Sequence, residues 1–186
     1  PHWSLRFGED QKTTDFLVAE GDKILKEYGN HPSFVLMALG NELQGSIELL
    51  NSTTADLKAK DSRHLYMTTS YSFQRPLGLV AQPEDEYFVT QYTKKGWVRG
   101  QGIFNAQSPK FNEDYTATSE HVPAPLISHE IGQYSVYPDM SEIEKYTGVL
   151  KPLNFMAIRN DIKEKGLFDM ADKFTNASGK LAAILY

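Results

Sequence analysis

The chain has 186 residues, of which 40% are hydrophobic and 23% are charged, and it contains no cysteine. This composition is typical of one globular domain, and it excludes extensive disorder, disulfides, thiol catalysis and thiolate metal sites. With 19 Lys and Arg against 24 Asp and Glu and no block of either sign, nucleic acid is not expected as a partner, and no apolar run approaches the roughly 20 residues that span a membrane.

The first predicted element is an amphipathic helix over residues 10–28. Apolar side chains recur there at helical spacing on one face: Leu17, Ile24, Leu25 and Tyr28. Gly29 is placed to cap the C-terminus of this helix, and Pro32 prevents its continuation.

Short apolar segments that follow predict strands at Phe34–Leu39, His64–Ser70, Tyr87–Tyr92 and Pro125–Glu130. The first of them is apolar throughout, as in a parallel strand that is buried on both faces. Stretches between the strands leave room for crossover helices, most clearly at residues 47–60. Repeated strand and helix units predict an α/β fold with a parallel sheet.

After Pro138 the pattern predicts helices only, over residues 141–147, 152–165 and 167–186. No convincing linker interrupts the chain, so we expect residues 1–186 to form a single unit. The chain begins at Pro1 rather than at Met, which we interpret as the start of a mature or excised piece.

Several common functional motifs are absent from the sequence. His129-Glu130 begins like the helix motif of zinc proteases, but Gln133 stands where the second histidine is required. No dinucleotide fingerprint, phosphate loop or Gly-x-Ser-x-Gly elbow is present, and the histidines lack the spacing of metal ligands. We therefore expect no metal and no cofactor.

Two acidic residues occupy equivalent places at the ends of predicted strands. Glu42 follows the first strand in Gly40-Asn41-Glu42, and Glu130 ends the last strand. Ligands collect at the carboxyl ends of parallel strands, so both carboxylates are expected to face one pocket. Two carboxyl groups about 5 to 5.5 Å apart carry out retaining glycoside hydrolysis, in which one donates a proton and the other attacks the sugar.

The residues around both acids resemble a known family. Residues 31–42, His-Pro-Ser-Phe-Val-Leu-Met-Ala-Leu-Gly-Asn-Glu, closely resemble the acid/base signature of glycoside hydrolase family 2, the β-galactosidase and β-glucuronidase group. Residues 124–130, Ala-Pro-Leu-Ile-Ser-His-Glu, resemble its nucleophile strand, and the order and gap also match. The resemblance implies a retaining, β-galactosidase-like O-glycosyl hydrolase that acts on a carbohydrate substrate. In it Glu42 is the acid/base, Glu130 is the nucleophile, and Asn41 binds the sugar's 2-hydroxyl.

The resemblance also implies a fold. In the family the acid/base ends barrel strand four and the nucleophile ends strand seven, and the two strands predicted between them fit this order. We therefore expect a partial (β/α)8 TIM barrel of about four parallel strands with a helical C-terminal segment, because a complete barrel takes about 250 residues. Such a fragment of a larger glycosidase would pair its exposed strand edges with a second copy, or cover them with the helices after Pro138. We expect weak or no turnover from it, and an exported parent enzyme would place it in the periplasm or outside the cell.

Aromatic residues near the strand ends are candidates for sugar binding. By the resemblance, Tyr92 would orient the nucleophile. Other rings that could stack on sugar faces are Tyr71, Phe73, Trp97 and Phe104. Trp97 also suits a second role, in which it packs a loop against the barrel.

Other interpretations remain open at this point. A glutamate after a buried strand is often only a residue at a helix start. A non-catalytic carbohydrate-binding or scaffold remnant would tolerate Glu42→Gln, whereas an enzyme would not. Another barrel glycosidase of the same clan, cellulase-like or mannanase-like, would share both acids and differ in its substrate loops. The sequence does not identify the sugar.

Overall fold

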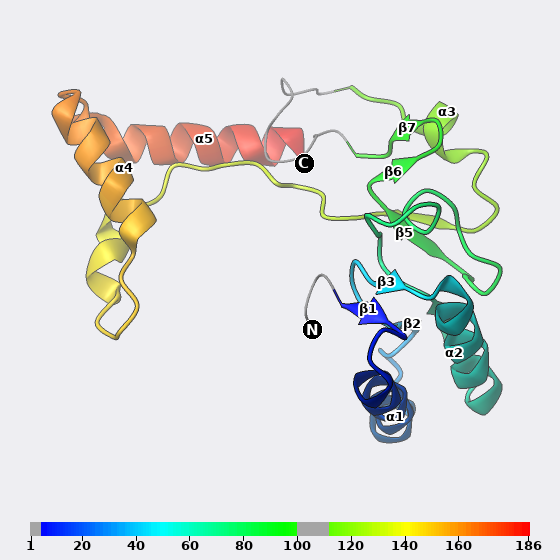
Figure 1. Cartoon of the computed structure of the whole chain (residues 1–186). Coiled ribbons are helices and arrows are strands. Elements are labelled where there is room, and N and C mark those ends of the chain that lie inside the picture. The colour runs from blue at the N-terminus through cyan, green and yellow to red at the C-terminus, as the bar shows by residue number, and fades with distance from the viewer. Residues whose placement is uncertain (1–4, 100–111) are drawn as a thin grey trace. The chain divides into compact units, whose positions relative to one another are not determined.

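The computed structural model describes residues 5–99 and 112–186 (Figure 1). Contacts within the chain define two compact units: the first has described residues 5–99 and 114–130, and the second has 112–113 and 131–186. We had expected one unit because no linker was evident. The division falls after Glu130, where residues 131–139 form neither helix nor strand. This segment, Ile-Gly-Gln-Tyr-Ser-Val-Tyr-Pro-Asp, mixes apolar with small and polar residues, so its composition carries no clear linker signal.

Two predicted helices of the first unit are present at nearly the predicted bounds. Helix α1 spans Gln11–Tyr28. Its N-cap residue is Asp10, whose carboxylate accepts a hydrogen bond of 2.7 Å from the amide of Thr13. Helix α2 spans Ile47–Lys60. Its N-cap residue is Ser46, whose hydroxyl accepts a hydrogen bond of 3.1 Å from the amide of Leu49. Local side-chain capping therefore fixes where both helices start.

The four predicted strands are also present, as short parallel pairs. Strand β2 (Leu36–Ala38) pairs with β4 (Leu65–Met67), and β5 (Phe88–Thr90) pairs with β8 (Leu126–Ser128). Backbone hydrogen bonds join the two pairs, from the Glu86 amide to the Tyr66 carbonyl at 2.9 Å and from the Tyr71 amide to the Val89 carbonyl at 2.8 Å. The fold is thus mixed α/β, and the described strands close no barrel.

Further short elements were not predicted. Strand β1 (Arg6–Phe7) pairs in parallel with β3 (Gln44–Gly45), while β6 (Tyr92–Thr93) and β7 (Gly96–Trp97) form an antiparallel hairpin. Helix α3 covers only Thr116–Ser119. Elements of two to four residues are too short to show a hydrophobic period.

One face of the β2–β4 pair packs against the helices. Met37 and Tyr66 are register partners, and both belong to a buried cluster with Leu25 of α1 and Leu57 of α2. The next pair in the register, Leu36 and Leu65, lies on the other face, and these side chains are 43% and 42% exposed. The expectation of burial on both faces is therefore wrong for β2 among the described residues. A second buried cluster lies under α2 and consists of Phe7, Leu43, Leu50 and Leu77.

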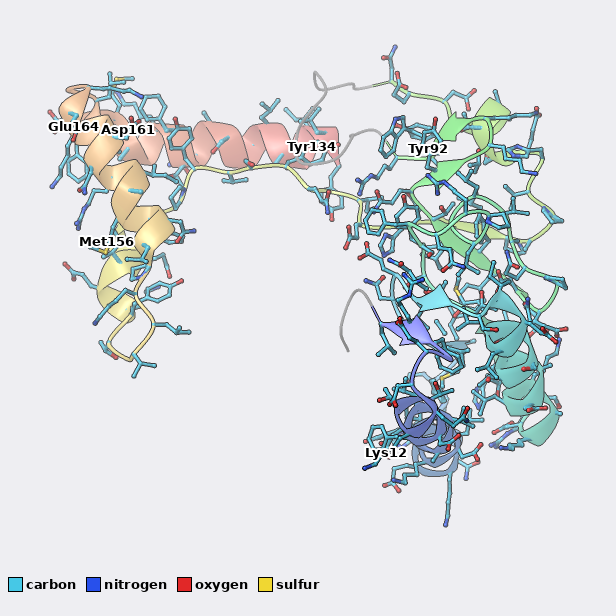
Figure 2. All side chains as sticks on the ribbon, viewed as in Figure 1. Lys12, Tyr92, Tyr134, Met156, Asp161 and Glu164 are labelled. Carbon is cyan, nitrogen blue, oxygen red and sulfur yellow. The ribbon has the colours of Figure 1, made fainter. Side chains whose placement is uncertain are left out.

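The second unit is helical, as predicted. It contains the 3-10 helices η2 (Met140–Lys145) and η3 (Phe168–Met170) and the helices α4 (Leu153–Glu164) and α5 (Ala171–Leu185). The extended segment before η2 runs beside α5 (Figure 1), where Tyr134 donates to the carbonyl of Leu185 at 3.2 Å (Figure 2). Among the helices of the described ranges, none has the length and apolar character that crossing a membrane requires.

Candidate active site

The site lies in the first unit, where the ends of β2, β4, β5 and β8 meet. Polar or aromatic residues lie within four residues after the end of each of these strands: Asn41, Glu42, Ser70, Tyr71, Gln91, His129 and Glu130. The amide of Ser70 donates to the carbonyl of Gly40, and the amide of Glu42 donates to the carbonyl of Ser70, each at 3.0 Å. The amide of His129 donates to the carbonyl of Thr90 at 2.9 Å. Backbone pairing therefore continues beyond the strands and holds their ends together.

The structure brings together the two carboxylates that the sequence analysis singled out. One carboxylate oxygen of Glu42, one of Glu130 and a ring nitrogen of His129 all lie within 4.8 Å of one another. Glu42 is buried, with 9% of its surface exposed, whereas Glu130 is exposed. The two acids thus share one location but differ in their contact with solvent.

The backbone at the site has an uncommon conformation. Glu42, Tyr71 and Glu130 have φ values of 55°, 55° and 50°, and they are the non-glycine residues of the described chain with positive φ. This left-handed conformation costs roughly 1 to 2 kcal/mol per residue, and such strain is concentrated at functional sites. At Glu130 it is supported by Arg99, whose Nη1 donates to the Glu130 carbonyl at 2.7 Å.

The environments of the two acids differ, and that of Glu42 shifts its pKa. Burial raises the pKa of Glu42, and the negative charge of Glu130 raises it further. The protonated form of Glu42 is therefore stabilised relative to that of an ordinary exposed glutamate. Two carboxyl groups in such unlike surroundings suit a division of work between proton donor and anion.

A set of hydrogen bonds connects the strand ends through side chains. The Asn41 Oδ1 accepts from Ser70 Oγ at 2.8 Å and lies 2.9 Å from His129 Nε2. The Gln91 Nε2 lies 3.2 Å from His129 Nδ1 and donates to Glu130 Oε2 at 3.3 Å. Asn41, which the sequence analysis placed at the site, is therefore held by Ser70 and His129, residues from two other strand ends.

The aromatic candidates divide into two groups. Tyr71 stacks on His129, with ring centroids 5.8 Å apart, and contacts Phe73 edge to face at 5.2 Å. Tyr92 and Trp97 contact each other edge to face at 5.1 Å across the β6–β7 hairpin (Figure 2 labels Tyr92). The structure places Gln91, one residue before Tyr92, against the Glu130 carboxylate. Phe104 lies outside the described residues.

Sequence reasoning missed several residues of the site, namely Ser70, Gln91 and His129, and it considered Arg99 only as a residue that touches substrate or solvent. The position of His129 in the sequence fits no metal motif, although it directly precedes Glu130. Arg99 is only 4% exposed, and its Nη1 donates to the carbonyls of both His129 and Glu130. A search for polar residues beside each strand end, rather than for motifs, would have found Ser70 and Gln91.

The same cluster has the donor atoms of a metal site. Glu42, His129 and Glu130 offer two oxygens and a nitrogen at suitable separations. However, both ring nitrogens of His129 already face hydrogen-bond partners, the Gln91 amide and the Asn41 oxygen. An ion bound through His129 would have to displace one of them, so the geometry fits a hydrogen-bonded network better than a metal centre.

Comparisons with known proteins add no family to this picture. No protein-family model matches the chain, and no curated protein matches it.

Proposed function

We propose that this chain carries the catalytic carboxylates of a retaining, β-galactosidase-like glycoside hydrolase. The observation that supports it best is the separation of less than 4.8 Å between carboxylate oxygens of Glu42 and Glu130. Retaining enzymes hold their carboxyl groups about 5 to 5.5 Å apart, whereas inverting enzymes hold them about 6.5 to 9.5 Å apart to admit a water molecule. The close pair favours attack on the sugar by a carboxylate.

In the proposed first step the Glu130 carboxylate attacks the anomeric carbon of a β-glycoside. The bond from that carbon to the leaving-group oxygen breaks, and Glu42 gives its proton to this oxygen. The raised pKa of Glu42, caused by burial and by Glu130, supports this role because the acid must be protonated when the reaction starts.

In the second step water attacks the same carbon and displaces Glu130. Glu42, now a carboxylate, accepts the proton of the water, so the enzyme returns to its starting state. While Glu130 is esterified it carries no charge, so one of the two causes that raise the pKa of Glu42 is removed. The same residue therefore suits both the acid and the base role.

The proposed site also offers a group for the sugar's 2-hydroxyl. The oxygen of the Asn41 amide already accepts two hydrogen bonds, so its NH₂ group is the part that can donate to a ligand. A neutral amide that strengthens its bond as the ring gains positive charge stabilises the transition state more than the substrate.

We further propose that the parallel strands are part of a TIM barrel. The connected order β2, β4, β5, β8 and the helices on one face of β2–β4 support this arrangement. The exposed Leu36 and Leu65 on the opposite face would then point into the barrel interior. Pairing of the outer strand edges with a second copy remains a prediction.

Covalent trapping tests the proposed function directly. The purified chain is incubated with 2,4-dinitrophenyl 2-deoxy-2-fluoro-β-D-galactoside and with the corresponding glucuronide, mannoside and arabinoside, and the product is digested and mapped by mass spectrometry. The fluorine slows hydrolysis of the glycosyl enzyme, so slow turnover is no obstacle. We expect one adduct, on Glu130, with at least one of these sugars.

Variants separate the two acids. Glu130→Gln should form no adduct. Glu42→Gln should still be labelled, because dinitrophenolate leaves without a proton, but it should release its sugar slowly and be accelerated by azide. Glu27→Gln, an exposed site on α1, should behave as the unmodified chain. No adduct with any of the sugars, or an adduct at another residue, would reject the proposed function and leave a carbohydrate-binding or scaffold role.

A further inference from the structure

The hydrogen bonds between the strand ends form one continuous series. It runs from Ser70 through Asn41, His129 and Gln91 to the carboxylate of Glu130, and each contact is between 2.8 and 3.3 Å. Its members come from the ends of β2, β4, β5 and β8. His129 is the central member, and it is 8% exposed.

The chemistry of the neighbours fixes the direction of every bond. The Gln91 Nε2 is an amide nitrogen that only donates, so His129 Nδ1 must accept. The Asn41 Oδ1 is an oxygen that only accepts, so His129 Nε2 must carry a proton and donate. The neutral imidazole with its proton on Nε2 is the one form that satisfies both neighbours.

The directions of these hydrogen bonds determine which polar groups remain available to a ligand. The Asn41 oxygen is occupied by Ser70 and His129, which prevents the amide from turning over and presenting its oxygen to the sugar. The two hydrogens of the Gln91 amide are divided between His129 and Glu130 Oε2. The orientation of the 2-hydroxyl donor and that of the nucleophile thus depend on the same imidazole.

We propose that His129 is a positioning residue that orients the Asn41 amide toward the sugar's 2-hydroxyl and, through Gln91, holds the Glu130 carboxylate. This inference rests on the proposed function for its consequence in catalysis. The hydrogen-bond arrangement itself is independent of the reaction.

The surroundings of His129 favour the neutral imidazole that these hydrogen bonds require. Burial lowers the pKa of His129, the Glu130 charge opposes this, and the Arg99 charge again lowers it. Glu42 lies within 4.8 Å, and Tyr71 stacks on the ring. A protonated imidazole would turn an Nδ1 hydrogen toward the Gln91 amide, so two donors would face each other and the series would break.

Substitution at His129 with two substrates distinguishes positioning from a merely structural role. The rates of dinitrophenol release are compared for 2,4-dinitrophenyl β-D-galactoside and its 2-deoxy analogue. In the unmodified chain, loss of the 2-hydroxyl should slow release by about 10- to 100-fold, the effect of a hydrogen bond to a charged transition state. In His129→Phe, which keeps a ring against Tyr71, this discrimination should fall to within about twofold, as it should in Asn41→Ala.

Further variants make the result specific. His129→Gln keeps an amide donor for Asn41 and should regain part of the discrimination. The double variant that combines His129→Phe with Asn41→Ala should lose no more discrimination between the two substrates than either single variant. His64→Phe, at a buried histidine whose ring centroid lies 4.7 Å from that of Phe34, should leave the discrimination unchanged. If His129→Phe slows both substrates equally and Glu130 is still labelled, the inference is wrong and the proposed function stands.

A measurement on the resting protein tests the arrangement without turnover. In ¹⁵N NMR spectra the imidazole of His129 should carry its proton on Nε2 at neutral pH. Because either neighbour alone selects this form, the preference should be lost only when Gln91→Leu is combined with Asn41→Ala. A proton on Nδ1, or a charged imidazole at neutral pH, would overturn the inference whether or not any sugar is hydrolysed.

Discussion

Glu42 and Glu130 follow separate strands, β2 and β8, in the same left-handed backbone conformation, with φ of 55° and 50°, and their carboxylates lie within 4.8 Å of each other. Such an arrangement is unfavourable for folding, because it combines backbone strain with two carboxyl groups held close together. Its presence at the ends of paired strands is typical of a site where function opposes stability.

The first prediction concerns stability at the site. Burial and the Glu130 charge raise the pKa of Glu42, so the folded chain favours the protonated carboxyl. As the pH rises through the ordinary range of Glu, ionisation is therefore less favourable in the folded than in the unfolded state, and stability is lost. Glu42→Gln should remove this loss and raise the stability at pH 7 by about 1 kcal/mol, measured by urea unfolding, while activity falls. Glu27→Gln is the exposed control, and equal effects of both variants would contradict the prediction.

The second prediction separates the two causes of the shifted pKa. Burial is the larger cause and the Glu130 charge the smaller one, so Glu130→Gln should lower the pKa of Glu42 only part of the way to its ordinary value. Carbon-13 NMR of labelled glutamate carboxyls measures this titration directly. A return to the ordinary value would show that charge, and not burial, dominates.

Much of the fold is encoded locally and could be predicted. The starts of α1 and α2 depend on Asp10 and Ser46, which lie next to the helices they cap. The strands β2 and β4 are evident as apolar segments. The pairing of β1 with β3 was missed because two residues carry no pattern, and the partners are brought together by tertiary contacts.

The two acids of the site could be predicted from the sequence, but the hydrogen bonds that connect the site residues could not. Glu42 and Glu130 each follow a recognisable strand, whereas the role of His129 depends on Asn41, 88 residues earlier in the chain. The amino-acid sequence does not reveal which non-glycine residues have a positive φ. A rule that looks for histidines close together in sequence cannot find one whose partners come from other strands.

The third prediction concerns Asp85, a buried acid that fixes the loop before β5. Its carboxylate accepts from the amide and the hydroxyl of Thr68, at 2.7 and 3.0 Å, and from the amide of Gln82 at 2.7 Å. Asp85→Ala should leave these donors unpaired and destabilise the chain by about 2 to 3 kcal/mol in urea unfolding. Asp56→Ala, at an exposed position of α2, should change the stability by less than about 0.5 kcal/mol. Equal effects would show that Asp85 contributes no more than a surface acid.

The fourth prediction addresses metal ions. Because the ring nitrogens of His129 face Gln91 and Asn41, we expect treatment with EDTA to leave the labelling rate of Glu130 unchanged within about twofold. Isothermal titration with Zn²⁺ or Mg²⁺ should show no tight site that Glu42→Gln abolishes. A loss of labelling in EDTA that Zn²⁺ restores would instead assign the cluster of Glu42, His129 and Glu130 to a metal.

The last prediction concerns strand β3, which follows Glu42. Gly45 has φ 103° and pairs with Phe7, and a Cβ there would overlap the backbone of Phe7. Gly45→Ala should therefore destabilise the first unit by about 1 to 3 kcal/mol and increase hydrogen exchange at the Ser46 amide, which donates to the Phe7 carbonyl at 2.9 Å. Gly148→Ala is the matched control, since no atom lies within 4 Å of the added carbon and its φ is not positive. That control should be neutral or stabilising by up to about 1 kcal/mol. If both glycines tolerate alanine equally, the close approach of β1 to β3 does not contribute to stability.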